Sequence, residues 1–437
     1  MSSTNRPLTI LCAGAYGIQN AGDDLPLVCL AAGMRRMLPG RELRFRALSR
    51  HPDPWEEKTY GVTMVQNPEY ESREAAEGRW FRGLNPDDDP EAFELICSEV
   101  RNCDLLVLGA GNALLDKTIG LLRGPIPLLA LYGSLARLYH KPLMLYGLSV
   151  GPLTTTWGRD LSRGLLEMAA VTTVRDRASL ALCTELCADS ETGADGASLR
   201  TTGRIHLLPD ATLAAAALAP DEDSLPPGGY GGRILAEENL SLPGDRPVLA
   251  LGLRDLHRPL GSAAGRALED SIMGMINELK DEVCFLFIPQ STYREDDDRK
   301  LARQLIARAA GEAPGAQCLA IVGRHHPLHL IDLYGLAQAT IAVRLHSAVF
   351  SALAGVPAVG VSYLPKVAGF MEQLGPDHPV YGLDELNADR LAQTALRLLD
   401  TPRSVRSDLL TRVDELGKQA LRHAELAVTA GLGITND

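Results

Sequence analysis

Residues 8–27 read LTILCAGAYGIQNAGDDLPL and contain the pattern that decides the fold. The apolar run at 8–13 is typical of a short buried strand, and the glycine-rich segment after it leads into an apolar stretch of helical pattern. Nucleotide-binding parallel sheets begin in this way, yet the G-x-G-x-x-G spacing of dinucleotide-binding proteins is missing. The stretch therefore predicts an α/β protein whose first loop holds something other than a dinucleotide.

The alternation of short apolar runs and helical patterns continues along the chain. Strands are predicted in the first half at ELRFRAL, DLLVLGA, PLMLYGLSV and AVTTVRD, with helices near 23–38, 90–101, 124–140 and 158–169. A second series begins at RPVLALGLRD and continues through EVCFLFIPQ, CLAIVG, ATIAVR and PAVGVSY. Such alternation indicates parallel sheets with helices on both faces.

The length of the chain predicts two domains, because 437 residues exceed the size at which single cores stop growing, about 250 to 300 residues. The segment PDEDSLPPGGYGG combines acidic residues, proline and glycine without periodicity, as linkers do. We therefore predict an N-terminal Rossmann-like domain at 1–219, a linker at 220–232 and a C-terminal Rossmann-like domain with terminal packing helices at 233–437. Two such domains with parallel sheets facing each other across a cleft would resemble the GT-B architecture.

Composition excludes several classes of function. A hydrophobic fraction of 46% with 22% charged residues is ordinary for a soluble enzyme, and no apolar run reaches the 18 or so residues of a membrane helix. A net charge of −12 argues against nucleic-acid binding, which depends on lysine and arginine. The N-terminus has no signal-peptide pattern, so we expect a cytoplasmic protein without an integral membrane segment.

Neither the cysteines nor the histidines predict a metal site. The eight cysteines lie mostly in apolar stretches without zinc-like spacing, and we expect them to be reduced and buried. The segment HHPLH at 325–329 holds three histidines, but no carboxylate or cysteine completes a recognisable ligand set.

Ligands of open parallel sheets bind beyond the carboxyl ends of the strands, so the loops after strands are the first candidates for function. In the first loop, Gly14, Gly17 and Gly22 permit positive φ angles or a close approach of the backbone. One of Asp23 and Asp24 is expected to cap the next helix. The other, beside Asn20, would bind or deprotonate a hydroxyl group.

The second such loop, GAGNALLDK at 109–117, is predicted to open a helix. Its small residues, with Gly111 and Asn112 among them, would then place helix N-terminal amides close to an anion or another ligand. The alternative is a tight turn that only packs the strand against the helix.

Three further loops place cationic side chains near strand ends. Arg175 ends one strand, and there it either pairs with Asp176 on the surface or clamps a carboxylate or phosphate. Arg344 and His346 end a strand in the second half, and Lys366 follows the next strand. A lone histidine is more often structural, but one near two cations is suited to proton transfer or anion binding.

Together these motifs resemble the polysaccharide pyruvyl transferase family. The first loop is similar to that family's G-x-x-G-x-x-N-x-G-D-[DE] pattern. Further similarities are YGLSVGPL at 146–153, the R-D-x-x-S that starts at Arg175, LPD at 208–210, IPQ at 288–290 and RLHSAVFSALAGVPAVGVSYLPKVAGF at 344–370. The resemblance extends in order from about residue 10 to about residue 375, which covers most of the chain.

The resemblance implies an enzyme that moves the pyruvyl group of phosphoenolpyruvate onto two hydroxyls of a hexose, forming a cyclic ketal. It implies that Arg175, His346 and Lys366 form the phosphoenolpyruvate site, to which we add Arg344 because it lies nearby in the sequence. His346 as imidazolium would protonate the enol, and Asp23 or Asp24 would orient or deprotonate the acceptor hydroxyl. No cofactor is expected beyond phosphoenolpyruvate as the donor substrate.

The acceptor side departs from the family, because GAGNALLDK replaces the usual G-G-G of the second loop. We expect a saccharide or a carrier-linked saccharide as acceptor and leave homo-oligomer formation open. Three alternatives compete with this interpretation: a GT-B glycosyltransferase that uses a nucleotide sugar, a noncatalytic binding protein that has kept the fold, and a relative that serves small-molecule biosynthesis.

Overall fold

A computed structural model describes residues 6–67, 90–116, 125–188, 203–218, 229–375 and 378–435. The chain divides into two compact units. Unit 1 comprises residues Met1–Ile18, Asp23–Ala214 and Gly417–Asp437, and unit 2 comprises Gln19–Gly22 and Ala215–Leu416.

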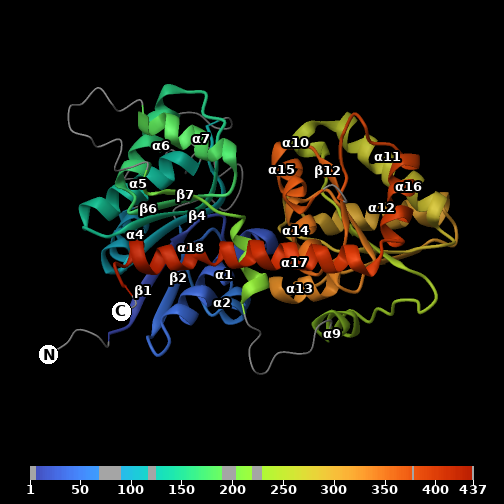
Figure 1. Cartoon of the computed structure of the whole chain (residues 1–437), viewed down its shortest axis with the longest axis horizontal. Coiled ribbons are helices and arrows are strands. Elements are labelled where there is room, and N and C mark those ends of the chain that lie inside the picture. Colours follow the sequence, from blue (N-terminus) through green and yellow to red (C-terminus); the bar gives the residue numbers. More distant parts are fainter. Residues whose placement is uncertain are drawn as a thin grey trace. The chain divides into compact units, whose positions relative to one another are not determined.

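Unit 1 contains a parallel sheet covered by helices on both faces. Its described strands have the order β3-β2-β1-β4-β5-β6-β7. They are β1 (Leu8–Ala13), β2 (Leu43–Ser49), β3 (Thr63–Gln66), β4 (Leu105–Leu114), β5 (Leu143–Val150), β6 (Val171–Val174) and β7 (Ile205–Leu207). The helices are α1 (Ala21–Met37), α2 (Pro54–Tyr60), α4 (Pro90–Asn102), α5 (Pro125–Leu138), α6 (Thr156–Met168), α7 (Arg177–Ala188), η1 (Ala211–Ala217), α18 (Arg422–Leu426) and η2 (Ala427–Gly431). Figure 1 shows α5 and α6 on one side of this sheet and α1 and α2 on the other.

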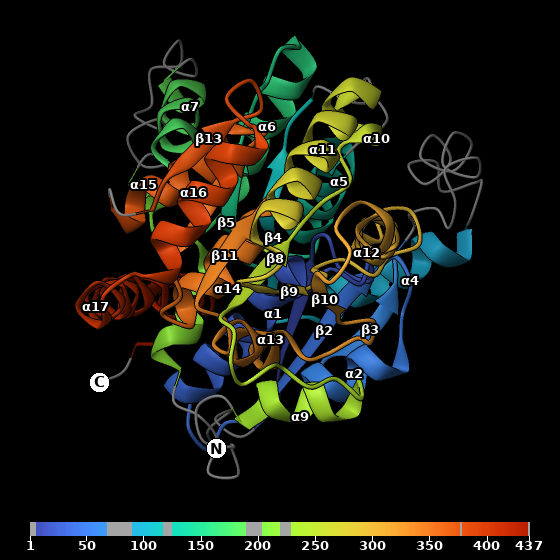
Figure 2. The same ribbon diagram turned by 90° about the vertical axis from the view of Figure 1, so that its right-hand side faces the viewer.

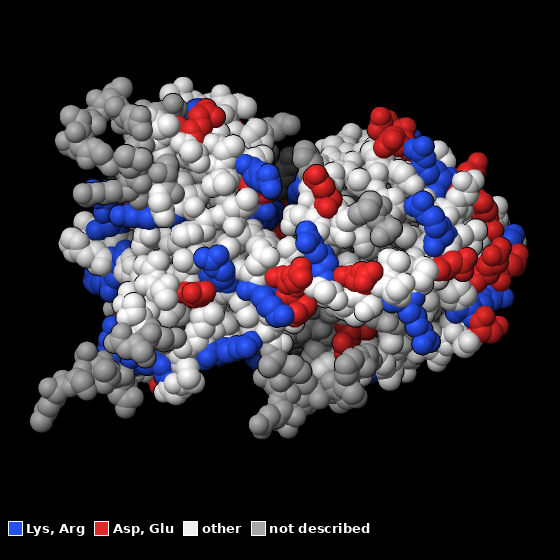
Figure 3. Space-filling view, in the orientation of Figure 1, with Lys and Arg blue, Asp and Glu red and all other residues white. Residues whose placement is uncertain are grey.

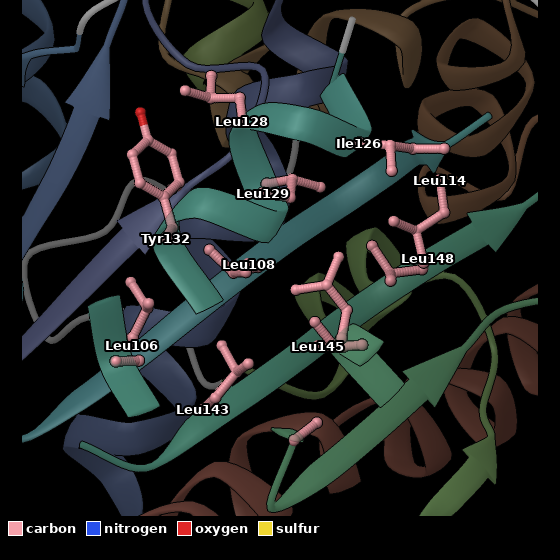
Figure 4. Close-up of a cluster of buried hydrophobic side chains, with 14 of the residues drawn as sticks. Leu106, Leu108, Leu114, Ile126, Leu128, Leu129, Tyr132, Leu143, Leu145 and Leu148 are labelled. Atoms are coloured by element: carbon pink, nitrogen blue, oxygen red, sulfur yellow. The ribbon is translucent and has the colours of Figure 1, made fainter. Parts of the chain in front are cut away.

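One hydrophobic core of unit 1 lies between the sheet and the helices α4, α5, α6 and α7. Leu106 and Leu108 on β4 and Leu143 and Leu145 on β5 are buried on the face of the sheet that α5 covers (Figure 4). Side chains on one face of a strand recur every second residue, which explains the spacing of these leucines. Their neighbours on the other face are also apolar, as expected for a parallel sheet that is covered on both sides.

Unit 2 repeats this architecture. Its described strands have the order β10-β9-β8-β11-β12-β13 and are all parallel. They are β8 (Val248–Gly252), β9 (Cys284–Phe287), β10 (Gln317–Ala320), β11 (Ala339–Ala342), β12 (Ala358–Ser362) and β13 (Val380–Gly382). The helices are α9 (Gly229–Glu237), α10 (His257–Leu260), α11 (Ser262–Leu279), α12 (Asp298–Glu312), α13 (Pro327–Tyr334), α14 (Leu345–Leu353), α15 (Pro365–Leu374), α16 (Ala388–Leu399) and α17 (Arg403–Ala420). Figure 2 shows α11 and α12 on one side of the sheet and α13 on the other.

The two strand orders define where ligands are expected to bind. In unit 1 the order reverses between β1 and β4, and in unit 2 it reverses between β8 and β11. Doubly wound sheets bind ligands at such switch points, beyond the carboxyl ends of the strands. The predicted fold of two parallel-sheet α/β domains is confirmed. The switch points hold the first two loops of unit 1 and the loop of Arg344 and His346, whereas Arg175 follows β6 and Lys366 follows β12.

The course of the chain between the units differs from the predicted domain boundaries. Residues 417–437 belong to unit 1 rather than to the C-terminal domain, and residues 19–22 belong to unit 2. The apolar pattern of the last helices indicates packing, but it does not indicate which core they cover. Most of the predicted linker, residues 220–228, lies outside the described residues.

The three histidines of HHPLH have structural contacts. His325 Nε2 lies 2.8 Å from Glu238 Oε1, and the ring of His329 stacks on Tyr230 with centroids 3.8 Å apart. His326 precedes α13, and its Nδ1 accepts a hydrogen bond of 3.1 Å from the backbone N–H of Leu328. His326 is thus the N-cap of α13, a role usually filled by serine, threonine, aspartate or asparagine.

The described surface mixes charges of both signs. Figure 3 shows acidic and basic side chains interspersed on the described residues of the face in view. No described helix is both long enough and apolar enough to cross a bilayer.

The cap of α13 predicts a pH-dependent stability. Burial, with a smaller effect of His329, lowers the pKa of His326 to about 4. The unfolded chain therefore binds more protons than the folded chain between about pH 4 and 6.5, so the free energy of unfolding falls as pH falls through this window, by up to about 3 kcal/mol. We expect His326→Asn, which keeps a capping acceptor without titrating, to lose this part of the pH dependence. Urea unfolding of the wild type and of His326→Asn at pH 5 and 7.5 tests this prediction. An equal change in the free energy of unfolding between the two pH values in both proteins would contradict it.

Candidate active site

The first loop packs closely against the end of β4. A side-chain carbon at Gly14 would lie 2.1 Å from the carbonyl oxygen of Gly109, so glycine is required for this approach. The buried hydroxyl of Tyr16 donates a hydrogen bond of 2.7 Å to the same oxygen. Burial raises the pKa of Tyr16, which keeps the hydroxyl protonated as a donor. These contacts fix the loop at the switch point of unit 1.

The next residues of the loop, 19–22, pair with the segment after β9 and so belong to unit 2. The backbone N–H of Ala21 donates to the carbonyl oxygen of Gln290 at 2.9 Å. The N–H of Thr292 donates to the carbonyl oxygen of Gln19 at 3.0 Å. Two backbone hydrogen bonds thus hold this part of the loop at the carboxyl edge of the unit 2 sheet.

Asn20 caps α1, which corrects the prediction that Asp23 or Asp24 does so. Its Oδ1 accepts a hydrogen bond of 3.1 Å from the N–H of Gly22, and the helix begins at Ala21. The helix starts earlier than the sequence pattern indicated, so both aspartates lie in its first turn. Carboxylates there still interact favourably with the positive end of the helix dipole.

Gly22 brings the first turn of α1 against His346. A side-chain carbon at Gly22 would lie 2.0 Å from Nδ1 and 2.5 Å from Cβ of His346, far inside van der Waals contact. His346 is the second residue of α14 and follows β11, at the switch point of unit 2. The structure therefore brings together three residues that the sequence singled out, namely Asn20, Gly22 and His346.

Arg344 fixes the turn between β11 and α14. Its guanidinium donates to both carboxylate oxygens of Asp298, at 2.7 and 2.6 Å, and lies 3.0 Å from Oδ2 of Asp296. Burial alone would lower the pKa of Arg344, but the two aspartates outweigh it and raise that pKa above its ordinary value. Arg344 thus stays charged and fixes the turn that leads to His346, while direct contact of Arg344 with substrate stays a prediction.

Two further cationic residues lie at the same carboxyl edge of unit 2. Lys366 is partly buried in the first turn of α15, after β12. Arg254, after β8, donates to the hydroxyl of Tyr363 at 2.7 Å and to Asp296 at 3.2 Å. The sequence analysis missed Arg254, although it follows a strand as Arg175 does and the same rule would have found it.

Arg175 occupies the corresponding edge of unit 1, at the end of β6. Its Nε donates to the hydroxyl of Ser149 at 2.7 Å, and its Nη1 donates to Asp210 at 2.7 Å. Only 10% of the arginine side chain and 9% of the aspartate side chain are exposed. Among the described residues, Nη2 of Arg175 has no hydrogen-bond partner, so one edge of the guanidinium remains available to an anion.

The rest of the R-D-x-x-S motif builds the turn that carries Arg175. Oδ1 of Asp176 accepts from the N–H of Ser179 at 2.7 Å, which caps α7. The hydroxyl of Ser179 accepts from the N–H of Val150 at 2.8 Å. The motif thus ties the end of β5 to the start of α7, directly after Arg175.

The two aspartates of the first loop differ in exposure. Asp24 is 2% exposed, and its Oδ2 accepts a hydrogen bond of 3.1 Å from the Tyr60 hydroxyl. Asp23 is half-buried. Of the two, Asp23 is therefore the more accessible to a substrate.

The second loop is not the start of a helix, contrary to the prediction. Strand β4 continues to Leu114 by pairing with β5, and α5 begins only at Pro125. Gly111 and Asn112 lie in this extension, where Asn112 is exposed. The carboxylate of Asp116 accepts from both backbone and hydroxyl of Thr155 at 2.6 Å and so holds the start of α6. Lys117 lies outside the described residues.

The candidate residues therefore fall into two groups. Asp23, Asp24, Gly111, Asn112 and Arg175 belong to unit 1, and Asn20, Gly22, Arg344, His346 and Lys366 belong to unit 2. Among the described residues, no group of three or more histidine, cysteine, aspartate and glutamate side chains has a metal-binding arrangement.

Comparison with known proteins identifies a family for this chain. A family model described as polysaccharide pyruvyl transferase matches residues 20–365, which include His346 and Arg175 and end just before Lys366. The matched span contains both switch-point loops of unit 2.

Solved structures of low sequence identity share the fold. HepE of Anabaena, crystallised with UDP and glucose, has 10% identity and a TM-score of 0.57, with 98% of this chain and 100% of that chain covered. The trehalose-phosphate synthase of Burkholderia vietnamiensis has 13% identity and a TM-score of 0.55, with 98% and 97% covered. The UDP-GlcNAc 2-epimerase of Methanocaldococcus jannaschii has 10% identity and a TM-score of 0.56, with 91% and 94% covered. These likenesses show a GT-B-like fold.

The close approach of Gly22 to His346 predicts the effect of a methyl group. We expect Gly22→Ala to push the His346 ring aside and to lower the free energy of unfolding by about 1 to 3 kcal/mol. Gly164, inside α6 with open space around it, is the matched control, and Gly164→Ala should be stabilising by about 0.5 to 1 kcal/mol. Urea unfolding measures both variants. If the Gly22→Ala protein were as stable as the Gly164→Ala protein, the close packing of Gly22 against His346 would be contradicted.

Proposed function

The chain belongs to the polysaccharide pyruvyl transferase family, and from this premise we propose that it transfers the pyruvyl group of phosphoenolpyruvate to two hydroxyls of a saccharide. The product is a cyclic ketal, and phosphate is released. The observation that carries the proposal is the histidine at the switch point of unit 2, against which Gly22 packs closely. A second observation supports it, the guanidinium edge of Arg175 that is unoccupied by described residues.

Phosphoenolpyruvate carries a carboxylate and a phosphate, so its site needs fixed cationic donors. Arg175 suits this role because Ser149 and Asp210 fix the plane of its guanidinium. A planar fork that is already oriented loses little entropy when it binds a carboxylate or phosphate. Lys366 and Arg254 are further candidates for binding the carboxylate and phosphate of phosphoenolpyruvate. Neither residue needs a metal ion to bind these groups.

His346 is the proposed acid. Its imidazolium donates a proton to C3 of the enol, which makes C2 electrophilic, and the first acceptor hydroxyl adds to C2 as its proton leaves. The C2–O bond to phosphate then breaks, and the second hydroxyl adds to C2 to close the ketal. One hydroxyl proton restores the imidazolium and the other leaves with phosphate, so the proton count balances. Protonation of C3 needs a donor that is fixed close to this carbon, and the close packing of Gly22 against His346 restricts the position of the imidazole ring.

Asp23 is the better candidate for orienting or deprotonating the acceptor hydroxyl. Asp24 is buried against Tyr60, whereas Asp23 is half-buried in the same turn of α1. We propose a saccharide, free or linked to a carrier, as the acceptor, and the cytoplasm as the place of reaction. The competing function is transfer of a sugar from a nucleotide sugar, because HepE with the same fold was crystallised with UDP and glucose.

Phosphoenolpyruvate binding is the first test. We expect calorimetry to detect it in the wild type and to find it weakened about 10- to 200-fold in Arg175→Ala, since one charge-assisted bond contributes about 1.5 to 3 kcal/mol. Arg163→Ala, which removes an arginine of α6 paired with Asp160, is the control and should bind as the wild type does.

A panel of nucleotide sugars belongs to the same titration. Tight binding of UDP-glucose together with no binding of phosphoenolpyruvate would reject pyruvyl transfer in favour of the competing function. Melting temperatures of the variants separate lost binding from lost folding, because Arg175→Ala also leaves Asp210 without its cation.

The role of His346 has its own test. We expect His346→Gln to lower kcat for phosphoenolpyruvate-dependent phosphate release by about 10²- to 10⁴-fold, as loss of a general acid does, with a smaller change in phosphoenolpyruvate affinity. The exposed His140 provides the control variant His140→Gln. Phosphate release is measured with a panel of hexose-containing acceptors, and an unchanged kcat would rule out His346 as the acid.

A further inference from the structure

The C-terminal segment of the chain contributes a buried histidine to unit 1. His423, in α18, is 2% exposed. The residues near His423 in the sequence pack closely against the rest of unit 1. A side-chain carbon at Gly33 of α1 would lie 2.7 Å from Cβ of Ala424, and one at Gly431 would lie 3.1 Å from Leu105. The segment is therefore an integral part of unit 1.

His423 makes one hydrogen bond with each ring nitrogen. Nε2 lies 3.0 Å from the carbonyl oxygen of Pro209, and Nδ1 lies 2.9 Å from the hydroxyl oxygen of Thr173. A carbonyl only accepts, so Nε2 carries the hydrogen and Nδ1 accepts from the threonine hydroxyl. Tyr146 also contacts the imidazole: the two rings are perpendicular, with centroids 5.3 Å apart.

Both hydrogen bonds end next to Arg175 and its partner. Thr173 lies two residues before Arg175 at the end of β6, and Pro209 directly precedes Asp210. Asp210 accepts from Arg175 Nη1 at 2.7 Å, and its other oxygen accepts from the N–H and hydroxyl of Thr212 at 3.0 and 2.7 Å. His423 therefore joins the strand that carries Arg175 to the loop that carries its aspartate.

We propose that His423 is a positioning residue, which sets the place of Asp210 and thereby orients the guanidinium of Arg175. Its effect on catalysis rests on the proposed function, in which Arg175 binds phosphoenolpyruvate. A purely apolar contact would fill the same space, but it would leave the Pro209 carbonyl and the Thr173 hydroxyl without this bridge.

The bridge requires a neutral imidazole, since a protonated Nδ1 cannot accept. Burial lowers the pKa of His423 to about 4, against smaller opposite effects of Pro209 and Asp210. The ring therefore stays neutral, and the bridge stays intact, at ordinary pH.

Hydrogen exchange on the ligand-free full-length chain tests the bridge without reference to any substrate. We expect His423→Leu to speed exchange of the amides of Leu208, Thr212 and Leu213 about tenfold, the effect of losing one hydrogen bond. His423→Gln, which keeps a donor and an acceptor, should restore much of the protection. Arg422→Ala, at the exposed neighbouring position of α18, is the control and should leave these amides unchanged.

Phosphoenolpyruvate titration of the same variants tests the effect on Arg175. We expect about tenfold weaker binding in His423→Leu, recovery in His423→Gln and no change in Arg422→Ala. Unchanged exchange at the three amides, or faster exchange with unchanged binding, would overturn the proposal. If the wild type binds no phosphoenolpyruvate, the proposed function fails, and the exchange data still decide whether His423 holds Asp210. Should His423→Leu not fold, His423→Asn replaces it: its shorter amide reaches the position of Nδ1 only, removes the bond to the Pro209 carbonyl and should speed exchange of the same amides.

Discussion

The missing side chain at Gly22 is the constraint on which the candidate site depends. It lets the first turn of α1 lie against the ring of His346, where any larger residue would displace the imidazole. The turn that precedes the histidine is fixed by Arg344, which donates hydrogen bonds to both carboxylate oxygens of Asp298. In the proposed reaction His346 is the general acid, and a general acid contributes most when its proton already points at the reacting atom. These contacts would then serve the chemistry as well as the stability.

An acidic protein can bind an anion only where its cations are kept local. With a net charge of −12, the chain gains nothing from a general basic field and instead holds individual guanidinium groups against aspartates. The two partly buried examples differ in one respect. Arg344 is engaged by Asp296 and Asp298, whereas Arg175 has one aspartate and one serine and keeps an edge of its fork unoccupied by described residues. That difference distinguishes a residue that orients the site from one that can bind an anion.

The sequence predicted the two sheets well because buried parallel strands and amphipathic helices have distinct periods. It also placed Arg175, Arg344, His346 and Lys366 after strands, where the structure has them, while their part in ligand binding stays a prediction. It did not predict the extension of β4 through Gly111 and Asn112, because small and polar residues have little strand preference and the extension depends on pairing with β5. Nor could it assign residues 417–437 to unit 1, because an apolar helix face does not specify its partner.

The two segments that the sequence assigned to the wrong unit share a physical role. Residues 19–22 hold the loop after β9 through backbone hydrogen bonds, and His423 holds the loop after β7 through its ring. Both loops follow strands, where the backbone leaves the sheet and loses its ladder of hydrogen bonds. A loop that must be ordered only when substrate arrives weakens binding by the entropy of that ordering. Segments distant in the sequence thus hold these loops where neighbouring strands no longer supply hydrogen bonds. For this reason, residues that support the candidate site are harder to find from the sequence than the candidate residues themselves.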